Sequence, residues 1–124
     1  MDNLSNAAAK ASINAVTNAP TEMTFFARFE DDILAGKKTI TIRDEAESHY
    51  VPGSVVMVST LEQGRVFCQL QILSVTPVLL SQLTEFHAEQ ENMTLPQLKS
   101  VIQEIYPGLE QLFVIDYQLY SANA

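Results

Sequence analysis

Residues 25–43, FFARFEDDILAGKKTITIR, contain the change of hydrophobic period that points to the fold. Apolar residues recur every four positions from Phe25 to Ile33, which predicts an amphipathic helix that ends at Gly36. From Thr39 the period becomes two, so that isoleucines alternate with hydroxyl and charged residues, and this predicts a strand. The stretch therefore predicts a helix that leads directly into a strand.

Downstream, residues 55–60 and 65–76 are rich in β-branched side chains, which is typical of strands. The four residues between them, LEQG at 61–64, contain a glycine and predict a hairpin turn. Residues 112–120 alternate apolar and polar side chains and predict a last strand.

Helical spacing separates the hairpin from the last strand. Leu79 or Leu80, Leu83 and Phe86 would share one face of a first helix. A second helix is expected after Thr94, a good N-cap residue with a glutamine three positions further on. The order is helix, three strands, two helices and a strand. Because strand and helix do not alternate regularly, we expect a small α+β domain around a curled sheet rather than a doubly wound parallel sheet.

The chain of 124 residues has the length of one domain. Residues 1–20 are polar and of low complexity, and we expect them to be a mobile extension. The domain is predicted to span residues 21–120, followed by a short polar tail at 121–124. The extension has no continuous apolar run, so we do not expect it to be a signal peptide.

Composition limits the class of function. Seven basic and fifteen acidic residues leave a net charge of −8, which repels phosphate backbones, so stable binding to nucleic acid is not expected. No apolar run is long enough to span a bilayer, so no membrane association is expected. Cys68, the single cysteine, shares a strand face with apolar residues, which favours a core position over a nucleophile. One cysteine needs no oxidising compartment, and a cytoplasmic location fits.

Four of the seven cations, Arg28, Lys37, Lys38 and Arg43, fall within sixteen residues. One interpretation is a solvated turn and strand edge, where lysines discourage edge pairing. The other is a catalytic site, because a lysine whose pKa is lowered by burial or by a neighbouring cation can take the proton of a threonine. On a straight strand Lys38 would point away from Thr41. The catalytic interpretation therefore requires Lys38 to lie in the turn before the alternation begins.

Two acidic runs contain residue types that can bind a metal ion. They comprise Glu85, His87, Glu89 and Glu91, and Asp44, Glu45, Glu47 and His49. Neither has a recognised ligand spacing, so we predict no metal. Glu91 lies near a predicted helix end and can approach another element, where a carboxylate beside a lysine can serve in proton transfer.

Three stretches carry a resemblance to a known family: residues 25–50, the segment HAEQENMTL at 87–95, and IYPG at 105–108. They resemble the ASCH-domain family, through its pattern of Gly36, Lys38, Thr41 and Arg43. Within that family the HAEQEN segment resembles the small single-domain N(4)-acetylcytidine amidohydrolases.

The resemblance implies a PUA-like mixed β-barrel flanked by helices. It also implies hydrolysis of N(4)-acetylcytidine to cytidine and acetate, with Lys38 as the base, Thr41 as the nucleophile and Glu91 as the third catalytic residue. We expect Arg43, Lys37 and Arg28 to contact this small nucleoside substrate. Arg43, or backbone N–H groups near the Gly36 turn, is a candidate to stabilise the oxyanion. No metal or organic cofactor is expected.

The alternative function belongs to a different class. PUA-like domains often bind RNA, so the same cationic strand would hold a modified base without catalysis. The net charge of −8 weighs against this alternative.

Overall fold

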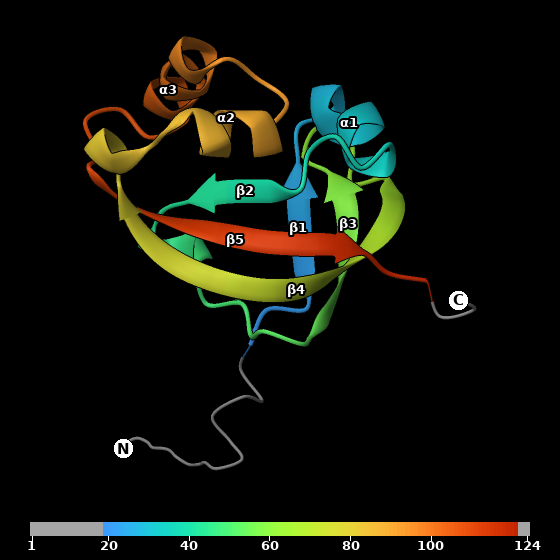
Figure 1. Cartoon of the computed structure of the whole chain (residues 1–124). Coiled ribbons are helices and arrows are strands. Elements are labelled where there is room, and N and C mark those ends of the chain that lie inside the picture. Colours follow the sequence, from blue (N-terminus) through green and yellow to red (C-terminus); the bar gives the residue numbers. More distant parts are fainter. Residues whose placement is uncertain (1–18, 122–124) are drawn as a thin grey trace, which may run out of the picture.

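A curved sheet of five strands runs through the molecule (Figure 1). The computed structural model describes residues 19–121. The strands are β1 (Glu22–Phe25), β2 (Ile40–Arg43), β3 (Val55–Thr60), β4 (Val66–Leu79) and β5 (Gln111–Leu119). Their order in the sheet is β1-β3-β4-β5-β2, with β1 parallel to β3 and all the other pairs antiparallel. The mixed sheet confirms the predicted α+β class.

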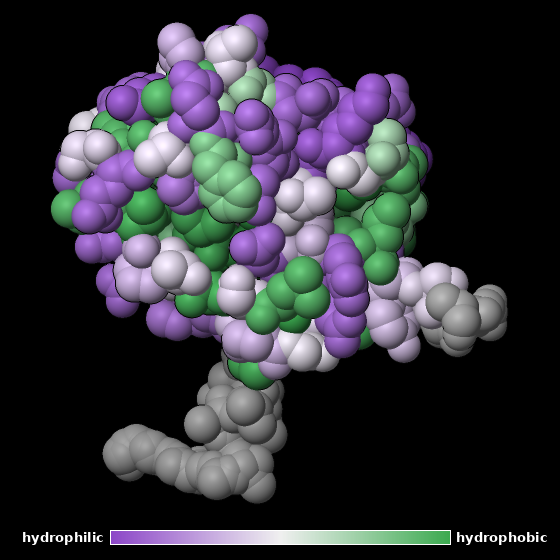
Figure 2. Space-filling model, in the orientation of Figure 1, coloured by the Kyte–Doolittle hydropathy of each residue, from purple (hydrophilic) through white to green (hydrophobic). Residues whose placement is uncertain are grey.

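The α-helices lie together against one side of this sheet (Figure 1). They are α1 (Glu30–Leu34), α2 (Glu85–Gln90) and α3 (Leu95–Ile105). Hydrophilic residues cover most of the surface over the helices, and hydrophobic residues are interspersed lower down over the strands (Figure 2). The buried residues of these helices are apolar, namely Ile33, Ala88, Leu98 and Ile102.

The first element differs from the prediction. Phe25 belongs to β1, where it is paired with Thr60 of β3, and a 3₁₀ turn at Ala27–Phe29 separates it from α1. The four-residue spacing of the aromatic residues arises because both the strand and the helix bury apolar side chains in the same core. Pairing between segments 35 residues apart cannot be read from a local period, which is why β1 was missed.

The predicted barrel is also wrong in detail, because the sheet stays open. Strands β1 and β2 form its two edges and are not paired with each other. Instead, the guanidinium group of Arg43 in β2 donates a hydrogen bond of 2.7 Å from Nη2 to the backbone oxygen of Thr24 in β1. With only four residues in each edge strand, a side chain bridges the gap that a ladder would have closed.

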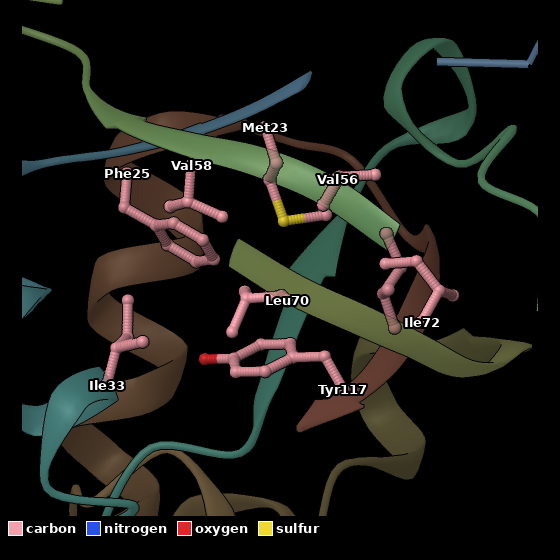
Figure 3. Close-up of a cluster of buried hydrophobic side chains, with 9 residues drawn as sticks. Met23, Phe25, Ile33, Val56, Val58, Leu70, Ile72 and Tyr117 are labelled. Carbon is pink, nitrogen blue, oxygen red and sulfur yellow. The ribbon is translucent and has the colours of Figure 1, made fainter. Parts of the chain in front are cut away.

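Two apolar clusters share the long strand β4. The first lies between the sheet and α1, and Figure 3 shows Met23, Phe25, Ile33, Leu70 and Tyr117 within it. The second lies under α2 and α3 and is formed by Ile40, Ile42, Val78, Leu83, Ala88, Leu98, Ile102, Leu112 and Val114. Strand β2 contributes Ile40 and Ile42 to the second cluster, and the guanidinium of Arg43 on the same strand lies 5.0 Å from the ring centre of Phe25 in the first.

Predictions that depend on residues close together in the chain agree with the structure better than the predictions of the first element and of the barrel. The hairpin of β3 and β4 turns where it was expected, and α3 begins after Thr94 with the predicted capping box. Phe86 was wrongly placed on the buried face of its helix, since it is 64% exposed. Only Leu83 of that predicted face is a buried core residue.

No helix within residues 19–121 is long and apolar enough to cross a bilayer. The predicted mobile extension falls almost entirely on residues 1–18, outside the described part of the chain, as does most of the tail. The boundaries at 21 and 120 stay predictions.

Candidate active site

Lys38 is the most deeply buried cation of the described residues, with 3% of its surface exposed. It lies between α1 and β2, before the strand alternation begins, as the catalytic interpretation required. Its Nζ donates a hydrogen bond of 2.7 Å to the backbone oxygen of Ile40 and a second hydrogen bond to Glu91 Oε1. The same nitrogen lies 5.4 Å and 5.2 Å from the ring centres of Phe25 and Phe29.

Burial changes the acid–base chemistry of this lysine. Removal from water disfavours the ammonium form and lowers the pKa of Lys38 below the usual lysine value. The carboxylate of Glu91 acts in the opposite direction, through its charge and its hydrogen bond, and the nearby Arg43 adds to the lowering. The environment thus brings Lys38 closer to the neutral state that a base requires.

Glu91 reaches Lys38 from the end of α2. The helix ends in a Schellman motif, in which Asn92 takes a positive φ of 58° and donates from its backbone to Glu89, while Met93 donates to Ala88. The side chain of Asn92 also donates to Asp32 at 3.2 Å, which ties this turn to α1. The HAEQEN segment therefore fixes the position of a carboxylate that is itself 5% exposed.

Thr41 is held by its neighbour on β2. Its Oγ1 accepts a hydrogen bond of 2.8 Å from Nε of Arg43, and the threonine is 5% exposed. Besides the bond to Thr24, Arg43 lies with Nη1 3.7 Å from Glu47 Oε1 and with its guanidinium 5.0 Å from the ring centre of Phe25. The guanidinium of Arg43 is therefore held by contacts within the protein, one of which is the hydrogen bond to Thr41.

A cavity of about 200 Å³ opens beside these groups. Lys38, Thr41, Arg43 and Glu91 all line it, so the structure brings together residues that are up to 53 positions apart. Most of the remaining lining is apolar and comes from β1, the 3₁₀ turn after it, and α3. The site is thus a mainly apolar pocket with a polar cluster on one wall.

Other predicted site residues lie elsewhere. Lys37 is exposed and does not line this cavity, and neither does Arg28. The guanidinium of Arg28 lies 5.1 Å and 5.0 Å from the ring centres of Phe26 and Phe29, which do line the cavity. Arg28 therefore supports the wall of the cavity from outside.

The Gly36 turn does not supply free backbone N–H groups that could donate to an oxyanion. The backbone N–H groups of Gly36, Lys37 and Lys38 donate to carbonyl oxygens of α1. The N–H of Thr39 donates to Gln90 at 2.7 Å, which links β2 to α2. These amides stabilise the turn and are already satisfied.

Sequence reasoning missed a contact at the rim of the cavity. Tyr106, at the C-cap of α3, donates a hydrogen bond of 2.6 Å from its hydroxyl to Glu47 Oε1. Both residues line the cavity. They are 59 positions apart. Both lie in stretches that carry the family resemblance, 25–50 and 105–108, but no spacing in the sequence pairs them.

The remaining candidates have structural roles. Nδ1 of His87 accepts from the backbone N–H of Thr84 at 3.1 Å and caps α2. Cys68 packs against the first apolar cluster, and burial raises the pKa of its thiol to about 11, which disfavours a thiolate nucleophile. Across residues 19–121, no three His, Cys, Asp or Glu side chains come together to form a potential metal site.

Residues 21–95 match the ASCH domain. A protein from Vibrio vulnificus (strain YJ016), named N(4)-acetylcytidine amidohydrolase, is 76% identical over 100 residues, which cover 81% of this chain and 96% of that protein. This chain belongs to the ASCH domain family. A protein of the same name from Shewanella baltica (strain OS185) is 64% identical to this ASCH domain protein over 81% of this chain and 95% of its own length.

A solved structure supports the fold. The ASCH domain from Lactobacillus crispatus JV V101 aligns with this ASCH domain with a TM-score of 0.65 at 17% identity, covering 81% of this chain and 80% of that chain. At this identity the likeness concerns the fold alone, and it agrees with the α+β architecture.

Proposed function

We propose that this protein hydrolyses the acetyl amide of N(4)-acetylcytidine and releases cytidine and acetate, as the names of its relatives indicate for them. The observation that carries the proposal is the buried Lys38–Glu91 pair, which opens onto the cavity that also holds Thr41. A buried lysine of lowered pKa that lines the same cavity as a threonine hydroxyl supplies the base that an activated threonine nucleophile requires.

The contacts of Lys38 suit a base. A neutral amine has two N–H groups and one lone pair, and Nζ already has two protein acceptors, the oxygen of Ile40 and the carboxylate of Glu91. In the neutral form both N–H groups are thus engaged, and the lone pair is left to accept the proton of Thr41.

The contacts of Thr41 suit a nucleophile. Because its oxygen accepts from Arg43, the hydroxyl hydrogen is free to donate to the base. As that proton leaves, the guanidinium stabilises the negative charge that develops on the oxygen. The threonine oxygen then forms a bond to the acetyl carbon, and the carbonyl oxygen becomes an oxyanion beside two cations, the Lys38 ammonium and Arg43.

The C–N bond breaks next. The proton taken from Thr41 passes from the Lys38 ammonium, with Glu91 as its hydrogen-bonded partner, to the exocyclic nitrogen of the leaving cytidine. A water molecule then attacks the acetyl ester while neutral Lys38 takes one of its protons. The Lys38 ammonium returns this proton to the Thr41 oxygen as the ester C–O bond breaks, and the released acetic acid loses its proton to the solvent to give acetate. The residues return to their starting protonation states, so no metal or cofactor enters the scheme.

The positions of the cations favour this function over noncatalytic RNA binding. Among residues 19–121, Lys38 and Arg43 are buried and Arg65 is paired with Glu30, so few cations are left to face a phosphate backbone. A neutral nucleoside also suits a chain of net charge −8. We place this activity in the cytoplasm and in a single domain of residues 21–120.

Incubation of the purified protein with N(4)-acetylcytidine, followed by chromatography, tests the proposal. We expect cytidine and acetate in equal amounts. The variant Thr41→Val keeps the shape of the side chain but lacks the hydroxyl, so its turnover should fall by about a hundredfold or more. Near-normal turnover of this variant would exclude the covalent route, and an inactive wild-type protein would exclude the proposed reaction.

A further inference from the structure

Away from the reacting groups, the cavity has walls suited to a flat ring. Phe26 and Leu61 line it together with Val101 and Ile105 of α3. The faces of a pyrimidine are compatible with such apolar walls. The ribose of a nucleoside, however, carries hydroxyl groups that require polar partners.

Glu47 supplies a polar partner at the rim. Among the described residues, Glu47 and Glu91 are the carboxylates that line the cavity, and Glu91 is buried against Lys38. The side chain of Glu47 is 49% exposed. Its Oε1 accepts from Tyr106, whereas its Oε2 has no hydrogen-bond partner within residues 19–121. A carboxylate oxygen is therefore available where the cavity meets the solvent.

The position of Glu47 relative to the nucleophile is set by Arg43. The guanidinium contacts Thr41 through Nε and faces Glu47 through Nη1, so the carboxylate lies one guanidinium group away from the nucleophile. A substrate whose acetyl carbon lies over Thr41 extends its ring away from that point and carries the ribose on the far end. Thr41 and Glu47 can thus contact the two ends of one nucleoside from the same wall.

We propose that Glu47 accepts hydrogen bonds from the cis hydroxyls of the substrate ribose and thereby selects ribonucleosides over free bases and 2′-deoxynucleosides. The inference rests on the proposed function, since it assigns a specificity residue to the same cavity. An ionised carboxylate has acceptor sites only, which matches two hydroxyl donors, and such bonds are stronger than those between neutral groups. Tyr106 holds the carboxylate in place by binding its other oxygen.

The variant Glu47→Gln tests this assignment. The amide oxygen can still accept from Tyr106, so the side chain keeps its place and loses its charge. We expect kcat/KM for N(4)-acetylcytidine to fall by about tenfold relative to that for N(4)-acetylcytosine, mainly through KM. The value of kcat/KM for N(4)-acetyl-2′-deoxycytidine should fall less than the value for the ribonucleoside. Glu45 and Glu47 lie on one 3₁₀ turn, Glu45–Glu47, but Glu45 does not line the cavity, so the matched control Glu45→Gln should keep the wild-type ratios.

Two results would overturn the inference. An unchanged ratio between nucleoside and free base in Glu47→Gln would show that the carboxylate does not contact the ribose. An equal fall for all three substrates would assign Glu47 to positioning Arg43 instead. The variant Tyr106→Phe removes the hydrogen bond that holds the carboxylate but keeps its charge, so the preference for the nucleoside over the free base should fall less than in Glu47→Gln.

Calorimetry separates this inference from the proposed function. If the wild-type protein cleaves none of the three substrates, the proposed function fails, but binding of cytidine and cytosine still tests Glu47. Tighter binding of cytidine than of cytosine, reduced about tenfold in Glu47→Gln, supports the assignment. Equal binding of the two compounds by the wild-type protein contradicts it.

Discussion

Two ion pairs in this molecule join the same kinds of group in opposite surroundings. Lys38 and Glu91 have side chains that are only 3% and 6% exposed, whereas those of Arg65 and Glu30 are 52% and 20% exposed. Both pairs connect distant segments: the first links the start of β2 to the end of α2, and the second links the β3–β4 hairpin to α1.

The difference in burial separates their roles. Taking two charges out of water has a cost that their attraction seldom exceeds, so a buried pair is a poor means of stabilising a fold. The same burial lowers the pKa of Lys38 and makes it useful as a base. The Arg65–Glu30 pair stays in contact with water and does not lower the pKa of a lysine. It therefore serves only to hold the β3–β4 hairpin and α1 together.

The largest effect is expected from breaking the buried pair. The variant Lys38→Met leaves the Glu91 carboxylate buried without its partner. Turnover of N(4)-acetylcytidine should fall by about a hundredfold or more. The free energy of unfolding should fall by about 3–5 kcal/mol, as for other broken buried pairs. Chromatographic assay and urea unfolding measure the two quantities.

The double variant Lys38→Met, Glu91→Met sharpens this test. Replacing both charges with apolar side chains should restore most of the lost stability, because no buried charge is left unpaired. Activity should stay as low as in the single variant. Recovery of turnover together with stability would contradict the catalytic role of the pair.

A smaller effect concerns pH. The ammonium group of Lys38 should titrate below the usual lysine range because of burial, and Glu91→Gln should lower its pKa further, because the carboxylate raises it. Nuclear magnetic resonance of the lysine ε carbons measures both values, and the spectrum of Lys38→Met assigns the signal. A rise in this pKa on removal of Glu91 would contradict the interpretation.

The same titration affects stability. Between the lowered pKa of Lys38 and the ordinary lysine value of 10.5, the unfolded chain binds more protons than the folded one. The contribution of Lys38 therefore makes the free energy of unfolding rise with pH across this window. The double methionine variant should lack this slope in urea unfolding.

The smallest effect is expected from the exposed pair. The variant Arg65→Met removes the bonds to Glu30, whose lengths are 2.6 Å and 3.2 Å, but leaves Glu30 hydrated. The melting temperature and turnover should change little, and added salt should reduce the difference further. A large loss of activity would show that the hairpin depends on this pair to hold Leu61 in the cavity wall.

Local chemistry explains which predictions were confirmed. The capping box of α3 and the β3–β4 hairpin depend on residues a few positions apart, so their patterns were readable in the chain. Strand β1 and the open sheet depend on pairing between distant segments, and both were predicted incorrectly. Phe86 was misplaced because the chain is extended at Leu83 and Thr84, so Leu83 and Phe86 do not lie on one continuous helix.

The sequence by itself determined the type of chemistry. Its cationic turn before a strand of alternating residues made Lys38 and Thr41 candidates for base and nucleophile, on the condition that Lys38 lies in the turn. The resemblance to the ASCH-domain family implied Glu91 and the substrate. Only the tertiary structure decided which charged side chains are buried away from water. It brought Glu91 to Lys38 across 53 positions. It also placed Tyr106 against Glu47 at the rim. These outcomes depend on burial and contact between distant segments, and no local pattern records either quantity.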